Sequence, residues 1–149
     1  LADEKPEQEE KMKQEYKAWF ADVGSTREEN YAPPRIVIGD RSEPVSDLSI
    51  QDWRVPNGAQ GWGEGGTWKV TFTGEDTYSV AVRWSEPIGA RDVDLRIGEQ
   101  VVSGTLGEGE TELLFSDVKV EKGDSDVSVA VSGKLNREST VRFVSFRKN

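Results

Sequence analysis

The 149-residue sequence contains no cysteine and no histidine. Without cysteine, these residues can form no disulfide, no thiolate metal site and no cysteine nucleophile. Without histidine, they lack the side chain that most often serves as general acid or base and as metal ligand. No other nucleophile and base stand out as a pair, so we do not expect an enzyme.

Positive charge is scarce as well. Nineteen Lys and Arg stand against 28 Asp and Glu, for a formal net charge of −9. Phosphate binding needs clustered positive charge, so we expect no nucleic-acid partner. No apolar run approaches the roughly 20 residues of a membrane span, and we expect no membrane partner. The polar first residues lack the features of a signal peptide, and we interpret the chain as a fragment of a longer protein.

Residues 1–24 predict one amphipathic helix. Pro6 suits the first helical turn, and Gly24 is placed to end the helix in a left-handed conformation. Apolar side chains recur between them at helical spacing, and we call them the apolar stripe: Met12, Tyr16, Trp19, Phe20 and Val23. The stripe packs either on the rest of this chain, which we favour, or on a domain outside this sequence.

Residues 25–44 predict a linker with a short strand at 36–38, and residues 45–149 predict a β domain. Period-2 alternation marks two strands, at 68–72 and 78–84, with residues 73–77 as a hairpin turn between them. Further strands are expected at 93–97, 100–104, 112–120, 127–132 and 140–146. Many short strands with glycine-containing turns indicate a mainly β fold, an antiparallel β-sandwich or jelly roll, preceded by the helix.

The glycine-rich segment 58–66 carries the most exposed-looking aromatic residue, Trp62. The segment lacks a phosphate-binding motif, so we interpret it as a long loop. Trp62 is then either a platform on which a sugar ring stacks or a plug that folds back on the core. Trp53, with Asp52 and Arg54 as polar neighbours, belongs to the same candidate sugar site.

Acidic residues alternate at Asp92 and Asp94 and again at Asp124 and Asp126. Alternation places each pair on one face of a strand, where two carboxylates could act together or bind Ca²⁺. A solvated strand face looks the same, and we favour that interpretation. No cluster has the spacing of a calcium-binding loop. The sequence therefore predicts no cofactor and leaves a structural Ca²⁺ ion open.

Two stretches resemble known families. Residues 17–23 (KAWFADV) and 30–39 (NYAPPRIVIG), continued by QDWR at 51–54, resemble the C-terminal region of bacterial sulfatases of the arylsulfatase type. Residues 66–84 resemble non-catalytic, galactose-binding-like carbohydrate-binding jelly rolls. The sulfatase catalytic motif, Cys or Ser followed by x-Pro-x-Arg, is absent, because the runs that begin at Ser42 and Ser85 lack the closing Arg.

The resemblance implies a non-catalytic C-terminal accessory domain of a periplasmic or extracellular sulfatase. Its partner would be the sulfatase catalytic domain on the N-terminal side. Two functions stay open: the domain holds a glycan near the active site, or it packs on the catalytic domain and binds no ligand. A chain of charge −9 suits a neutral sugar better than a sulfated one.

Overall fold

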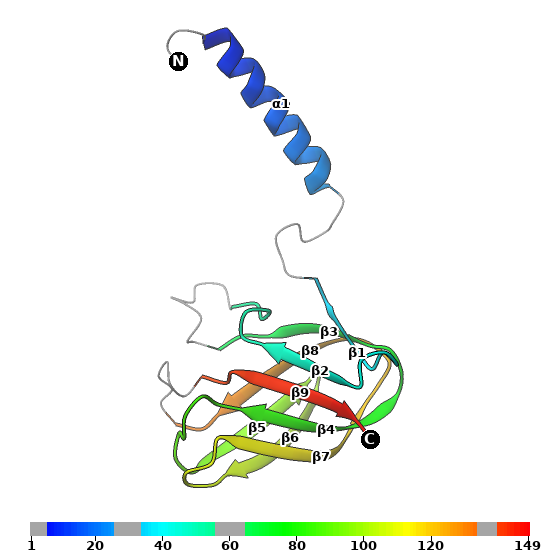
Figure 1. The fold of residues 1–149 in the computed structure, drawn as a ribbon, viewed down its shortest axis with the longest axis vertical. Coiled ribbons are helices and arrows are strands. Elements are labelled where there is room, and N and C mark those ends of the chain that lie inside the picture. The colour runs from blue at the N-terminus through cyan, green and yellow to red at the C-terminus, as the bar shows by residue number, and fades with distance from the viewer. Residues whose placement is uncertain (1–5, 26–33, 56–64, 134–139) are drawn as a thin grey trace. The chain divides into compact units, whose positions relative to one another are not determined.

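The computed structural model describes residues 6–25, 34–55, 65–133 and 140–149. The chain divides into two units, residues 1–32 and residues 33–149 (Figure 1). Within these described ranges, the first unit contains one helix and the second contains nine strands. The short strand expected at 36–38 falls in the second unit, together with the strands that follow it.

Helix α1 spans Pro6–Gly24, which confirms the predicted helix. Within its unit, α1 buries none of its residues, and the side chain of Trp19 is 58% exposed. The rings of Trp19 and Phe20 each lie with their centroids 5.8 Å from that of Tyr16. No described helix is long and apolar enough to cross a membrane.

The end of α1 differs from the expectation for Gly24. Gly24 is still helical and is not among the glycines with positive φ. The last turn is closed instead by Ser25, whose backbone N donates to the Ala21 carbonyl at 3.0 Å and whose Oγ donates to the Asp22 carbonyl at 2.8 Å. A serine hydroxyl can satisfy a terminal helix carbonyl, so no left-handed residue is required there.

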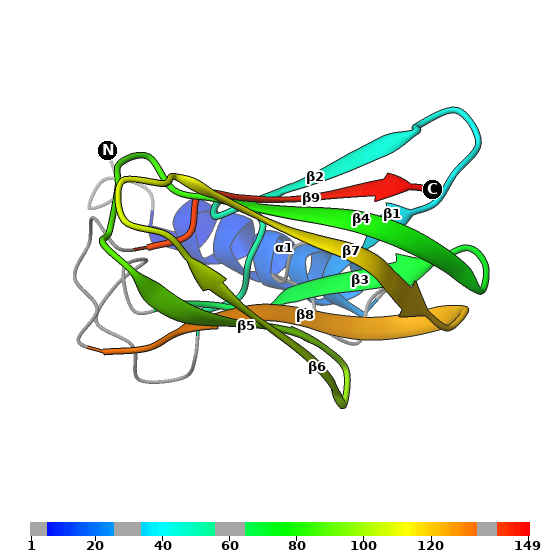
Figure 2. The same cartoon turned by 90° about the horizontal axis from the view of Figure 1, so that it is seen from below.

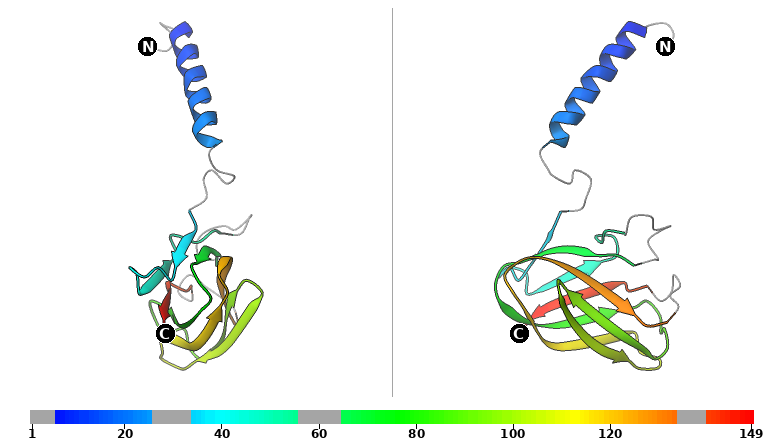
Figure 3. Two further views of the ribbon diagram at one scale, coloured as in Figure 1. Left: turned by 90° about the vertical axis from the view of Figure 1, so that its right-hand side faces the viewer. Right: turned by 180° about the vertical axis from the view of Figure 1, so that it is seen from behind.

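The nine strands form two facing sheets, which confirms the predicted β-sandwich (Figures 2 and 3). The five-stranded sheet has the order β1 (Ile36–Ile38), β3 (Trp68–Phe72), β8 (Gly123–Val131), β5 (Arg91–Ile97) and β6 (Gln100–Leu106). The four-stranded sheet has the order β2 (Val45–Ser49), β9 (Phe143–Lys148), β4 (Asp76–Arg83) and β7 (Glu112–Val120). All these neighbours are antiparallel except β1 and β3, which are parallel.

The apolar side chains at alternate positions of the predicted strands fill the space between the two sheets. In β3, residues 68, 70 and 72 are buried, and in β4, residues 78, 80 and 82 are buried. Each large apolar side chain that is fully buried contributes about 1.5–3 kcal/mol. Trp84, the residue that follows β4, is buried as well.

The connections between strands are where the structure departs from the sequence prediction. Residues 73–77 do not form a hairpin, because β3 and β4 belong to different sheets. Among consecutive described strands, only β5 and β6 are neighbours in one sheet, joined at Gly98 with φ +57°. Alternation shows that a strand buries one of its faces. Because strands of both sheets do so, the pattern cannot tell which sheet a strand belongs to.

Strand β1 lies at the edge of the sandwich, although the sequence placed it in a linker. Its three residues pair with 70–72 of β3, and Ile38 is fully buried. Gly39 follows with φ +91°, and a Cβ added there would collide with the Tyr78 hydroxyl oxygen and lie 2.9 Å from Thr73 Oγ1. Gly39 therefore lets the backbone pass close to the hydroxyl end of the buried Tyr78 side chain.

We expect Gly39→Ala to lower the free energy of unfolding by about 2 kcal/mol or more, because it adds both a strained positive φ and a steric clash. Urea unfolding of the wild type and the variant measures this loss. In a Tyr78→Phe background the clash with the hydroxyl is absent, so the same substitution should cost less. Equal costs in both backgrounds would show that the clash with the Tyr78 hydroxyl contributes nothing to the loss.

Tyr78 also predicts a response to alkaline pH. Burial raises the pKa of its hydroxyl, the Asp76 carboxylate raises it further, and Lys148 opposes both. Above about pH 10 the unfolded state loses the tyrosine proton first, so the stability of the fold decreases as pH rises. We expect Tyr78→Phe to lose less stability than wild type between pH 9 and pH 11 in urea titrations. Parallel losses would contradict this assignment.

Candidate functional site

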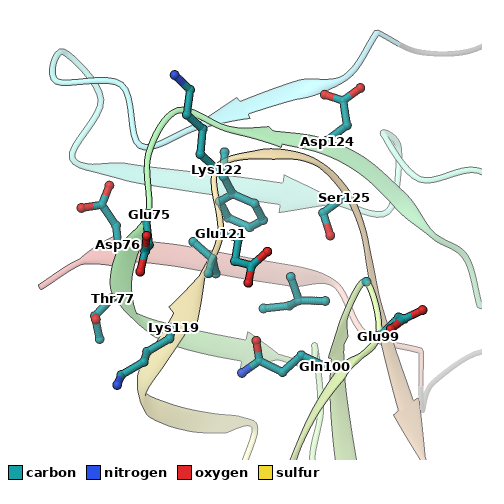
Figure 4. Close-up of a pocket in the computed structure, with 14 residues that line it drawn as sticks. Glu75, Asp76, Thr77, Glu99, Gln100, Lys119, Glu121, Lys122, Asp124 and Ser125 are labelled. Carbon is teal, nitrogen blue, oxygen red and sulfur yellow. The ribbon is translucent and has the colours of Figure 1, made fainter.

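A cleft of about 810 Å³ opens at one end of the sandwich, within the range of about 300–1,000 Å³ found for small-ligand sites (Figure 4). Three connections meet there: β3 to β4, β5 to β6, and β7 to β8. The β3–β4 and β7–β8 connections cross from one sheet to the other, and the β5–β6 connection is a hairpin within one sheet. The strand order therefore brings together three segments that are each about 25 residues apart in the sequence.

The cleft has an apolar floor and a polar rim. Phe72, Ile97 and Val120 form the floor, and each is the last buried residue of its strand. The rim consists of Glu75, Asp76, Thr77, Glu99, Gln100, Lys119, Glu121, Lys122, Asp124 and Ser125. Core packing holds the floor, and the rim is built from the strand ends and turns just beyond it.

Two of the five rim carboxylates are already engaged. Asp76 Oδ2 pairs with Lys148 Nζ at 2.6 Å. Asp124 pairs with Arg35 Nε at 3.0 Å and accepts a hydrogen bond from Thr71 Oγ1 at 2.7 Å. These contacts tie β4 to β9 and β8 to β3, so both aspartates have a structural role.

The other three carboxylates come from three different connections: Glu75, Glu99 and Glu121 (Figure 4). Among the described residues, none of the three has an ion-pair or hydrogen-bond partner at its carboxylate. A carboxylate only accepts hydrogen bonds, so each can receive one or two hydroxyl groups of a ligand. The Gln100 amide and the hydroxyls of Thr77 and Ser125 add donors and acceptors.

The electrostatic balance of the cleft is close to neutral. Its five carboxylates face Lys119 and Lys122 on the rim and the paired Lys148 and Arg35, which leaves one net negative charge. Nothing in this balance favours a polyanionic ligand. The arrangement suits an uncharged ligand rich in hydroxyl groups.

The alternating aspartates serve the five-stranded sheet rather than a shared ligand. Asp92 and Asp94 on β5 accept hydrogen bonds from Thr105 at 3.2 Å and Ser103 at 2.7 Å on β6. Asp126 on β8 pairs with Lys69 of β3 at 2.5 Å. Among the described residues, no three carboxylates are grouped so that they could hold a metal ion.

Of the residues proposed from sequence for a sugar site, the three that the structure describes, Asp52, Trp53 and Arg54, do not line the cleft. Trp62 lies outside the described residues. Asp52 is exposed and accepts a hydrogen bond from Ser49 Oγ at 2.7 Å, which stabilises the turn after β2. Arg54 joins Thr67 through backbone hydrogen bonds of 2.8 and 3.0 Å.

Trp53 is a core residue and not an exposed platform. Only 3% of it is exposed, and its ring centroid lies 5.2 Å from that of Trp68. A Cβ added at Gly66 would lie 2.5 Å from the Trp53 ring, so the chain at Gly66 covers it closely. The structure therefore does not present the Trp53 ring as an exposed surface on which a sugar could stack. Trp53 lies outside the regular strands, so no alternating pattern in the sequence could predict that it is buried.

Sequence reasoning missed the cleft altogether. The sequence predicts glycine-containing turns between successive strands, but turns occur at both ends of a sandwich. Only the strand order shows that the three connections of the cleft lie at the same end.

No protein-family model matches the sequence, and no curated protein matches it. Solved structures do match. They include a GH26-CBM35 β-(1,4)-mannanase of Podospora anserina (TM-score 0.52, 11% identity, 71% of this chain and 28% of that chain). A Cry1Da tryptic core variant of Bacillus thuringiensis is also similar (TM-score 0.54, 16% identity, 78% and 25%), as is a β-glucosidase from Paenibacillus barengoltzii (TM-score 0.52, 11% identity, 78% and 11%).

The fold is a β-sandwich. At 11–16% identity the likeness concerns the fold alone, and no site residue carries over. The chain spans about a quarter or less of the length of these proteins. Nothing in the comparisons links the chain to a sulfatase.

We expect Trp53→Ala to lower the free energy of unfolding by about 3–5 kcal/mol, the usual cost of removing a buried aromatic side chain. Trp53→Phe should cost less, because it keeps most of the packing against Trp68. Urea unfolding followed by circular dichroism measures both. Unchanged stability combined with lost sugar binding would restore Trp53 as a ligand-binding residue.

Proposed function

We propose that the sandwich is a non-catalytic carbohydrate-binding domain. Its ligand enters the cleft formed by the β3–β4, β5–β6 and β7–β8 connections. The observation that carries the proposal is the composition of that cleft: three uncommitted carboxylates, an amide and two hydroxyls around an apolar floor. A sugar presents hydroxyl groups around a ring with apolar C–H surfaces. The rim accepts and donates the hydrogen bonds while the floor contacts the ring.

The cleft favours a neutral glycan. Glu75, Glu99 and Glu121 would repel a sulfated or uronic sugar, and the charge of the whole chain adds to this repulsion. The described rim contains no aromatic side chain, so hydrogen bonds rather than stacking hold the ligand. A cleft of about 810 Å³ suits one end of a glycan or a short oligosaccharide.

The fold supports carbohydrate as the class of ligand, in a limited way. One of the similar structures is a mannanase whose name includes a CBM35 module. The same sandwich also occurs in a Cry1Da core, so fold alone does not select a ligand. The proposal therefore rests on the hydrogen-bonding groups and the apolar floor of the cleft.

The parent protein belongs to the proposal as well. The residues at 17–23, 30–39 and 51–54 support a C-terminal accessory role in a periplasmic or extracellular sulfatase, with the catalytic domain as partner. The domain itself would be no enzyme and would need no cofactor. The titration described below tests whether Ca²⁺ contributes to binding. The parent assignment rests on the sequence resemblance alone.

The second candidate is a packing domain without a ligand. The apolar stripe of α1 favours it, because Tyr16 and Trp19 are about 60% exposed within their unit. Burying them against another protein would stabilise the assembly by about 1.5–3 kcal/mol for each side chain. This function predicts that the isolated chain binds no oligosaccharide.

We expect a saturable response when ¹⁵N-labelled protein is titrated with neutral oligosaccharides, and a weaker one with sulfated oligosaccharides. Amide shifts should concentrate at Glu99, Gln100 and Glu121. Glu121→Gln should weaken binding about tenfold or more, because it removes a charged acceptor. Parallel titrations with and without Ca²⁺ show whether the ion contributes.

Glu86→Gln is the matched control, because Glu86 is exposed and does not line the cleft. It should bind like wild type. Shifts that cluster away from the cleft would reject the site, and a flat response to every sugar would favour the packing function.

A further inference from the structure

The outward face of the four-stranded sheet has a chemistry of its own. Its inward residues, such as Leu48, Val82 and Val144, are fully buried in the core. Alternation therefore turns their neighbours outward. We call this surface the outer face and define it by Asp47, Ser79, Ala81, Arg83, Glu112, Leu114, Phe143, Ser145 and Arg147.

A chain of hydrogen bonds crosses the outer face from one edge strand to the other. Arg83 of β4 donates through Nε to Glu112 of β7, and through Nη1 to Ser145 Oγ of β9 at 2.8 Å. Ser145 Oγ in turn donates to Asp47 of β2. Each of the four strands contributes one residue, in the order in which the strands lie in the sheet.

This row of hydrogen bonds fixes the positions of the polar side chains and still leaves some of their donors and acceptors free to bind a ligand. Ser145 is buried, so its two contacts fix Arg83 and Asp47 from beneath. The side chains of Arg83 and Glu112 remain 45% and 49% exposed. A guanidinium has five N–H donors and a carboxylate has about four acceptor positions, so each keeps unused positions toward solvent.

Two large apolar side chains stand exposed beside the polar chain. Phe143 is 46% exposed and lies opposite Arg83 in the sheet register, and Leu114 is 57% exposed and lies opposite Ala81. Small residues, Ala81 and Ser145, lie between them. An exposed ring next to preorganised hydrogen-bonding groups fits a ligand that is apolar on one surface and polar at its edge.

The charges on the outer face and on the whole chain disfavour a polyanionic ligand. Asp47 and Glu112 are balanced on this face by Arg83 and Arg147, in a chain whose overall charge is −9. Two apolar side chains among four charges are also too few for the apolar centre of a stable protein interface. Four strands span about 14 Å, enough for more than one sugar ring.

We propose that the outer face is a second binding surface, for an extended neutral polysaccharide. A sugar ring stacks on Phe143, and its hydroxyl groups bond to Arg83, Glu112 and Asp47. The surface shares none of these residues with the cleft, so it stands independently of the function proposed there. The cleft takes a glycan end and the outer face takes the length of a chain.

Affinity electrophoresis in gels that contain hydroxyethylcellulose, galactomannan, xylan or heparin tests the proposal with the full 149-residue chain. We expect at least one of the three neutral polysaccharides, and not heparin, to retard wild-type protein. Phe143→Ala should weaken that retardation about tenfold. Phe143→Trp should preserve it, because the ring is kept.

Val101→Ala is the matched control, since Val101 is also half-exposed but lies on β6 of the other sheet. It should leave retardation unchanged. Urea unfolding of each variant confirms that the fold persists, and Phe143→Trp tests the surface even if Phe143→Ala does not fold.

The remaining outcomes separate this surface from the cleft. Retardation that is lost in Glu121→Gln but kept in Phe143→Ala overturns the outer-face proposal and leaves the cleft standing. No retardation by any neutral polysaccharide overturns it as well. A sedimentation experiment in which Phe143→Ala converts a dimer to a monomer would identify the face as a protein interface and overturn it too.

Discussion

The contact between the two sheets is the interaction on which the rest of the β unit depends. Phe72 from the five-stranded sheet packs on Tyr78 and Phe146 from the four-stranded sheet, with ring centroids 5.7–6.0 Å apart. Phe72 also forms part of the floor of the cleft, so the contacts with Tyr78 and Phe146 hold that part of the floor in place. The position of Gly39, the alkaline response and the shape of the cleft all follow from this cluster.

The two outward faces of the sandwich use charge differently. On the five-stranded sheet, aspartates on β5 and β8 are bonded to hydroxyls or cations of the next strand, and these bonds hold strands in register. On the four-stranded sheet, one continuous chain of hydrogen bonds crosses every strand and is flanked by exposed apolar side chains. The first pattern consumes its polar groups internally, whereas the second leaves some available to a ligand.

Local patterns were reliable where a single element carries the signal. The apolar stripe predicted α1, and alternation predicted β3 and β4, because helical and strand periods depend only on backbone geometry. The same patterns failed at Gly24 and at residues 73–77. A helix end can be satisfied by a neighbouring serine, and a turn sequence does not state which sheet the next strand joins.

The candidate sites divide in the same way. Composition alone determined that this chain has no cysteine or histidine chemistry and carries a net charge of −9, and periodicity determined a helix followed by a β-sandwich. The tertiary structure decided that Trp53 is buried, that three distant turns form one cleft, and that Asp47, Arg83, Glu112 and Ser145 meet across four strands. The physical reason is that secondary structure follows from local backbone geometry. A site depends on strand order and register, which are set by contacts between residues far apart in the chain.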